Sequence, residues 1–148
     1  MHSFISSLHH VVFATKRREA LLTPQVRERL WPYLSGIARE NGMKALAVGG
    51  VNDHVHMLLS LPATMSVAKA MQLLKGNSSK WIRQTFPNLG RLAWQEGYAA
   101  FSIGVSGIES TRAYIRSQAE HHRTKTYREE VIAFLQRHGL PFDEAMIE

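Results

Sequence analysis

Residues 51–62 read VNDHVHMLLSLP, and this stretch decides the fold. The part from 54 to 61 is rich in apolar residues and is typical of a β-strand. Because side chains alternate along a strand, His54 and His56 point to the same face of the sheet. We expect that face to be open. We expect helices to cover the opposite face, which carries the apolar side chains of Val55, Met57 and Leu59.

Three further strands are predicted from the same kind of composition. Residues 8–14, 44–51 and 98–105 are rich in β-branched and apolar side chains. Between these segments, Thr23 and Ser66 each stand where the N-cap of a helix is expected. The predicted order is therefore strand, helix, strand, strand, helix, strand.

The C-terminal part is predicted to add two helices, over residues 110–122 and 128–138. A βαββαβ order predicts an α+β fold of the ferredoxin-like (RRM-like) class. In this class one antiparallel sheet has helices on one face, and here C-terminal helices follow. With 148 residues, we expect a single domain spanning residues 1–148.

The composition narrows the classes of partner. Lys and Arg number 18 against 12 for Asp and Glu, and the net charge of +6 favours a polyanion, either nucleic acid or an anionic membrane surface. The positive charge could also serve solubility alone. The absence of cysteine excludes disulfides and thiolate metal sites and suits a cytoplasmic location. Without a long apolar run or a GxxxxGK[ST] loop, we expect no membrane association and no nucleotide cofactor.

The histidine pair is the sharpest local motif. Neutral imidazole is a common metal ligand, and two imidazoles on one face of a strand can share an ion. Two surface histidines on a half-exposed strand are the alternative explanation for His54 and His56.

A tyrosine and a glutamine form a second motif in the predicted helix over residues 110–122. Tyr114 and Gln118 are four residues apart, so they share a helix face. A phenol with a pKa near 10 is a poor nucleophile, but a metal ion that polarises the attacked phosphate makes it useful. Gln118 offers a neutral oxygen to the same ion. Packing of Tyr114 in the core is the alternative.

Two basic segments are candidates for contacts with DNA. Lys75, Ser78 and Lys80 lie in the segment KGNSSKW of the second predicted helix, where cations, hydroxyls and an aromatic ring occur together. The predicted turn after the first strand carries Lys16, Arg17 and Arg18. Solvated basic surfaces are the alternative in both places.

The ordered set of motifs resembles the small single-tyrosine transposases of the HUH (His-hydrophobic-His) superfamily, REP-associated tyrosine transposases included. Nearly the whole chain takes part in the resemblance. The segments, in chain order, are HHVVFATKRR, VNDHVHMLLSLP, LKGNSSKWI, WQEGYAAFSIGVS, AYIRSQAEHHRTKTYREE and FLQRHGLPFDE. Arg17 departs from the pattern because relatives often carry an aromatic residue after the lysine.

The resemblance implies a set of roles. His54 and His56 match the metal ligands of the superfamily, Gln118 matches the third ligand, and Tyr114 matches the nucleophile, whereas Tyr127 lies outside the motif. The implied cofactor is Mg²⁺ or Mn²⁺. The implied enzyme is a homodimer that cleaves and rejoins single-stranded DNA at hairpin-marked element ends through a 5′-phosphotyrosine. In such dimers the tyrosine helix of one subunit can complete the metal site of the other.

Other functions remain open on the sequence alone. A replication initiator, a relaxase or a domesticated relative would share the chemistry without the mobility. A single-strand nucleic-acid-binding module without activity would favour aromatic residues on the central strands, where this chain carries histidines. A homo-oligomeric metal-binding regulator would bind without cutting.

Overall fold

The computed structural model describes residues 2–122 and 124–147. The elements of the sheet layer and its first helices follow in this order: β1 (Leu8–Ala14), α1 (Pro24–Glu40), β2 (Lys44–Gly50), β3 (His54–Ser60), α2 (Val67–Thr85) and β4 (Ala99–Ile103). The C-terminal helices are α3 (Ile108–Arg116), α4 (Gln118–His121) and α5 (Tyr127–Arg137). Within the described ranges, no helix is both long and apolar enough to cross a membrane.

The four strands form one sheet in the order β2-β3-β1-β4, and every neighbouring pair is antiparallel. This order, with helices after β1 and β3, confirms the ferredoxin-like prediction. β3 and β1 are the central strands, and their register pairs Val12 with His56 and Ala14 with His54. The histidine motif therefore lies in the middle of the sheet, at the end where β3 begins.

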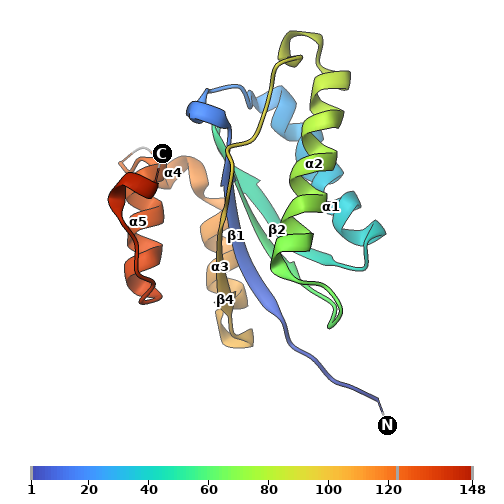
Figure 1. Cartoon of the computed structure of the whole chain (residues 1–148), viewed down its shortest axis with the longest axis vertical. Helices are drawn as coiled ribbons and strands as arrows, with labels where there is room; N and C mark the ends of the chain where they lie inside the picture. Colours follow the sequence, from blue (N-terminus) through green and yellow to red (C-terminus); the bar gives the residue numbers. More distant parts are fainter. Residues whose placement is uncertain (1, 123, 148) are drawn as a thin grey trace.

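Helices α1 and α2 pack side by side on one face of the sheet (Figure 1). Both predicted N-caps are confirmed, because the side chains of Thr23 and Ser66 accept hydrogen bonds from backbone N–H groups in the first turns of α1 and α2. The predicted inward-facing residues of β3 join the main hydrophobic core against these helices, and they are Val55, Met57 and Leu59.

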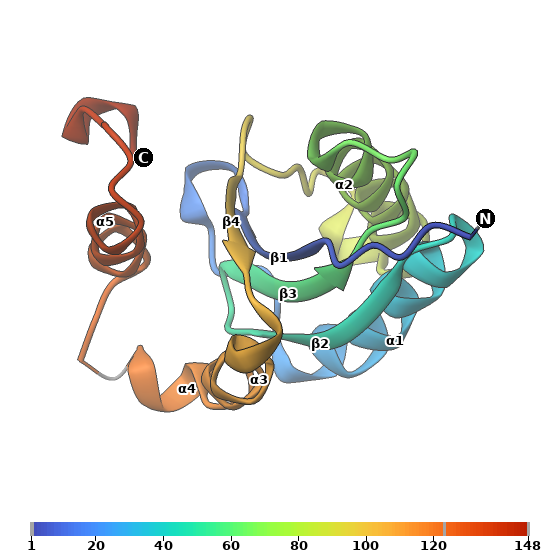
Figure 2. The same cartoon turned by 90° about the horizontal axis from the view of Figure 1, so that it is seen from below.

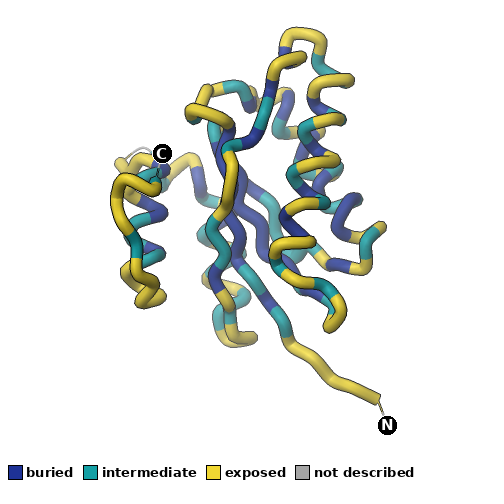
Figure 3. The backbone as a smooth tube through the Cα atoms, in the orientation of Figure 1, coloured by how far each residue is buried: buried dark blue, intermediate teal, exposed yellow. Residues whose placement is uncertain are grey.

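The opposite face of the sheet is covered, although we expected it to be open. Helices α3, α4 and α5 lie on this side (Figures 1 and 2), and the central strands β1 and β3 are largely buried (Figure 3). A second, smaller apolar cluster joins α5 to β1 through Tyr127, Val131, Val12 and Ala14. His54 and His56 are consequently fully buried.

The helix predicted over residues 110–122 is broken at Ser117, where φ is −103° and ψ is 28°. The Ser117 hydroxyl donates a hydrogen bond to the Ala113 carbonyl, four residues earlier. This kind of side-chain bond competes with the helical pattern and bends or ends helices. The break separates α3, which carries Tyr114, from α4, which begins with Gln118.

Candidate active site

The structure brings together the four residues for which the sequence predicts a catalytic or ligand role. The His54 and His56 rings lie side by side on β3, with ring centroids 5.2 Å apart. Gln118 Oε1 lies 3.2 Å from His54 Nε2. The Tyr114 ring stands edge-on to the His56 ring at a centroid distance of 5.7 Å. The four side chains therefore converge from three separate elements, which are β3, α3 and α4.

Two residues that the sequence did not single out orient the imidazoles. His54 Nδ1 donates to the Asp53 carboxylate at 2.7 Å, and His56 Nδ1 is hydrogen-bonded to His10 Nε2 at 2.8 Å. Because the Nδ1 atom of each ring makes one of these hydrogen bonds, both Nε2 atoms face the interior of the cluster. Metal-binding histidines are usually held in this way, through the ring nitrogen that does not bind the ion. Asp53 immediately precedes the histidine motif, and this adjacency was the available signal in the sequence.

A buried carboxylate from α5, Glu130, lies at the centre of the cluster and was not predicted. Its Oε1 lies 2.9 Å from His56 Nε2, 3.4 Å from His54 Nε2 and 3.3 Å from His122 Nε2. Its Oε2 accepts hydrogen bonds from the Tyr114 hydroxyl and from Gln118 Nε2. The side chain of Glu130 is only 3% exposed, so its charge is balanced by these neighbours and not by solvent.

The shared carboxylate dominates the electrostatics of the site. Burial alone would raise the pKa of Glu130, but hydrogen bonds from the three imidazoles outweigh it and hold this pKa far below its ordinary value. Burial also opposes the charged form of His54, yet its contacts with Asp53 and Glu130 raise the pKa of that ring to about 9. Burial prevails at His56 and lowers its pKa to about 4, since one carboxylate charge does not stabilise two adjacent imidazolium ions.

The Tyr114 phenol is held in its protonated form. Burial, the hydrogen bond to Glu130 and the negative charge of that residue all raise the pKa of the phenol above its ordinary value. The hydroxyl therefore needs a cation nearby before its oxygen becomes a good nucleophile.

Comparison with known proteins identifies the family. Residues 3–118 match the profile of the family described as Transposase IS200 like. The chain belongs to the IS200-like transposase family. The family and its curated relatives are transposases, so this chain is a DNA transposase enzyme. The matched range ends at Gln118, before His122 and Glu130.

Two curated transposases are similar over most of their length. The ISDra2 transposase TnpA of Deinococcus radiodurans is 28% identical over 122 residues, which cover 79% of this chain and 84% of that protein. The transposase for insertion sequence element IS200 of Salmonella typhimurium is 29% identical over 127 residues, which cover 82% of this chain and 83% of that protein. The resemblance to single-tyrosine transposases is thereby confirmed.

Two solved structures share the fold. A crystal structure assigned to a transposase of Deinococcus radiodurans has a TM-score of 0.64 and 25% identity, and the match covers 80% of this chain and 95% of that chain. The REP-associated tyrosine transposase bound to a REP hairpin has a TM-score of 0.60 and 16% identity, and the match covers 82% of this chain and 72% of that chain. The second likeness is one of fold alone.

A polar groove of about 650 Å³ opens beside the cluster of this transposase. It is lined by two of the predicted DNA contacts, Arg17 and Arg18, together with Asp53, His122 and Lys125. Both arginines adopt positive φ, 57° and 51°, a backbone conformation that costs residues other than glycine about 1 kcal/mol each. This turn presents two cations at the mouth of the site. The third predicted contact of the turn, Lys16, is exposed and lines a neighbouring hollow with Arg17.

The other predicted DNA contacts are on α2, which lies on the opposite face of the sheet from α3, α4 and α5 (Figure 1). Lys75 Nζ donates to the backbone carbonyls of Gln95 and Gly97, both at 2.7 Å. Ser78 is fully buried, and its hydroxyl oxygen accepts a hydrogen bond from Trp94 Nε1, so we leave Ser78 out of the proposed contacts. Lys80 is exposed and remains available.

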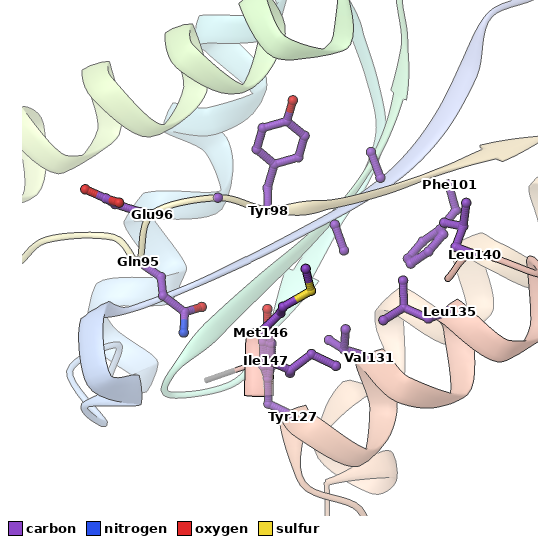
Figure 4. Close-up of a pocket in the computed structure, with 13 residues that line it drawn as sticks. Gln95, Glu96, Tyr98, Phe101, Tyr127, Val131, Leu135, Leu140, Met146 and Ile147 are labelled. Carbon is purple, nitrogen blue, oxygen red and sulfur yellow. The ribbon is translucent and has the colours of Figure 1, made fainter. Parts of the chain in front are cut away.

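An apolar hollow of about 490 Å³ lies between α5 and β4 (Figure 4). Its lining is mostly aliphatic and aromatic, and the main contributors are Tyr98, Phe101, Val131, Leu135, Met146 and Ile147. None of the described residues that line it is a lysine or an arginine, so this surface is poorly suited to bind a phosphate. We therefore look for the phosphate chemistry at the imidazole cluster and not in this hollow.

Proposed function

We propose that this chain is a metal-dependent transposase that cleaves and rejoins single-stranded DNA at hairpin-marked element ends through a 5′-phosphotyrosine on Tyr114. The observation that carries the proposal is that the Tyr114 hydroxyl and the Nε2 atoms of His54 and His56 meet at one carboxylate. A nucleophile and a set of metal ligands so close together can act on the same phosphodiester. The related REP-associated transposase, which is bound to a REP hairpin, supports a hairpin substrate.

The donor set fits a divalent cation. His54 and His56 turn their Nε2 atoms inward, and Gln118 brings a neutral oxygen to the same place. We propose these three residues as ligands of Mn²⁺ or Mg²⁺. When bound, such an ion supplies Lewis-acid stabilisation of the charge that develops on the attacked phosphate.

The proposed reaction exchanges one phosphodiester for another. The Tyr114 oxygen forms a bond to phosphorus, the bond from phosphorus to the 3′ oxygen breaks, and the proton lost by the phenol is balanced by the proton that the 3′ hydroxyl gains. Rejoining is the reverse step with a different 3′ hydroxyl. The exchange needs no nucleotide hydrolysis, because the number of phosphate ester bonds does not change.

The proposed homodimer follows from this chemistry. One chain supplies one nucleophilic tyrosine, so two chains are needed to hold two cut ends at once. Tyr114 lies beside the imidazoles of its own chain, so each subunit can carry a complete site. We propose the polar groove beside His122 as the path of the strand, with Arg17 and Arg18 as phosphate contacts.

The decisive experiment uses end-labelled single strands from the DNA that flanks the gene. In Mn²⁺ or Mg²⁺, we expect a covalent protein–DNA complex on a denaturing gel, and we expect Tyr114→Phe to lose cleavage and the complex while still binding the hairpin. Tyr98→Phe, at an exposed tyrosine outside the cluster, is the matched control and should react normally. A covalent complex formed by Tyr114→Phe would show that the nucleophile is a different residue.

Metal removal tests the second part of the proposal. A chelator should abolish cleavage, and His56→Ala should do the same in added Mn²⁺ or Mg²⁺, because an inward-facing ligand is lost. Hairpin binding by the same variant, measured by gel shift, controls for folding. Cleavage that continues in chelator would reject the metal role. Binding without any cleavage by the wild-type chain would favour a non-catalytic binding module.

A further inference from the structure

The residues around Glu130 offer more potential metal ligands than those predicted from the sequence. We propose that Glu130 and His122 are ligands of the same ion as His54 and His56, and that this set selects a transition-metal ion such as Mn²⁺ over Mg²⁺. The inference rests on the proposed function only for the presence of an ion at the site. It concerns two residues beyond the range that matches the family profile.

Geometry is the first support. The Nε2 atoms of three imidazoles, from His54, His56 and His122, all lie within 3.4 Å of Glu130 Oε1. One ligand atom from each of the four residues lies within 4.8 Å of every other. Four donors that converge in this way can surround one ion after small shifts of their side chains.

Burial is the second support. His54, His56 and Glu130 are buried, and His122 is partly exposed where it lines the polar groove. The buried donors are shielded from water, whereas the groove gives an ion and a phosphate a way in. Catalytic metal sites have this form, with protein ligands on one side and an open position on the other.

The helix that carries Glu130 is anchored next to the site. The Thr126 side chain and Glu129 form a capping box at the start of α5, and the Tyr127 ring stacks on His54 with centroids 5.0 Å apart. Glu130 is the next residue after the capping box, so the capped first turn of the helix helps to position its carboxylate.

The chemistry of the donors indicates the kind of ion. Mg²⁺ prefers oxygen ligands and retains several water molecules, so a set of three nitrogens suits it poorly. Imidazole nitrogen with one carboxylate suits transition metals, and Mn²⁺ also accepts carboxylate, carbonyl and water ligands. The second oxygen of Glu130 accepts the hydrogen bonds of Tyr114 and Gln118, so the carboxylate links the ion site directly to the phenol.

The test measures metal binding without DNA. Mn²⁺ is titrated into the full chain and the signal of free Mn²⁺ is followed by electron paramagnetic resonance. Glu130→Gln, which keeps the shape but removes the charge, should weaken Mn²⁺ binding by at least tenfold, since even residues that only orient ligands are worth about 10- to 100-fold. Glu129→Gln removes the same charge one residue earlier and suits the capping box, so it should bind Mn²⁺ like the wild type.

A second variant guards against a folding defect. Circular dichroism in chelator tells whether Glu130→Gln is folded, and His122→Ala removes a partly exposed ligand while His54 and His56 still contact the Glu130 carboxylate. We expect His122→Ala to weaken Mn²⁺ binding as well. Wild-type affinity in a folded Glu130→Gln chain, or in His122→Ala, would overturn the proposed ligand set. Displacement of Mn²⁺ by a roughly equal concentration of Mg²⁺ would overturn the metal preference.

Failure of this inference differs from failure of the proposed function. If Mn²⁺ binds through Glu130 and no covalent DNA complex forms, only the proposed function is wrong. If the covalent complex forms and Glu130→Gln binds Mn²⁺ normally, only the ligand set is wrong.

Discussion

At the scale of single residues, the site depends on which nitrogen each imidazole presents. A histidine can bind an ion through either ring nitrogen, and its hydrogen bond to a neighbour selects one of them. Asp53 makes this selection for His54, and His10 makes it for His56. The two ligands predicted from the motif therefore depend on two residues that the motif does not define.

Asp53→Asn tests this dependence. The amide keeps the size of the side chain but removes the charge that orients His54, so we expect Mn²⁺ affinity to fall by about 10- to 100-fold. The measurement is the same titration of free Mn²⁺ by electron paramagnetic resonance. Asp143→Asn, at an exposed N-cap outside the cluster, is the control. An unchanged affinity in Asp53→Asn would mean that packing alone holds the His54 ring.

At the scale of elements, the contact between α3 and β2 sets the position of Tyr114, the proposed nucleophile. Gly49 of β2 has no side chain, and the backbone of α3 comes so close that a Cβ there would lie 2.4 Å from the Ile115 carbonyl oxygen. Tyr114 directly precedes Ile115. The close approach of strand and helix therefore helps to place the phenol beside His56.

Gly49→Ala is expected to push α3 away from the sheet. The added methyl group should cost about 1–3 kcal/mol of stability, and a displacement of about 1 Å should slow cleavage by on the order of 100-fold. Single-turnover cleavage and thermal unfolding measure the two effects.

Gly76→Ala is the matched control for that substitution, because a Cβ at this position meets no atom of the described residues within 4 Å. It should stabilise α2 by about 0.5–1 kcal/mol and leave cleavage unchanged. Equal cleavage rates for Gly49→Ala and Gly76→Ala would show that the α3 contact does not position the nucleophile.

At the scale of the whole molecule, the basic side chains differ in whether they face the groove where we expect DNA to bind. The net charge is +6, and cations from distant parts of the chain, Arg17, Arg18 and Lys125, meet in the polar groove at the cluster. Lys75 is instead tied to backbone carbonyls. Binding of a single strand should therefore depend on the groove more than on the total charge.

Salt dependence measures this difference. For single strands, each phosphate contact contributes about 0.7 to the slope of log affinity against log salt concentration. We expect Arg18→Ala and Lys125→Ala each to lower affinity and to reduce the slope by about that amount. Arg39→Ala removes an exposed cation at the end of α1 and should leave the slope unchanged. Equal salt-dependence slopes for all three variants would mean that the DNA strand binds outside the polar groove.

Local sequence patterns were sufficient to predict most of the strands and helices. The β1 prediction over residues 8–14 is confirmed, as are the caps at Thr23 and Ser66, because alternation, apolar periodicity and capping are determined by neighbours a few residues away. The break at Ser117 was missed, since whether a serine hydroxyl turns back to a carbonyl is not visible in a helical pattern. The roles of His54, His56, Gln118 and Tyr114 stay predictions, now with a geometry that supports them.

The sequence by itself determined the order of strands and helices and the pairing of two imidazoles on one face of β3, because both follow from short-range periodicity. Only the tertiary structure decided that this face is covered and that Glu130 meets His56, a residue 74 positions away in the chain. Periodicity shows which side of α5 is apolar, but not which surface that side packs against. That choice is made by burial of the whole chain, and it is what brings the carboxylate to the histidines.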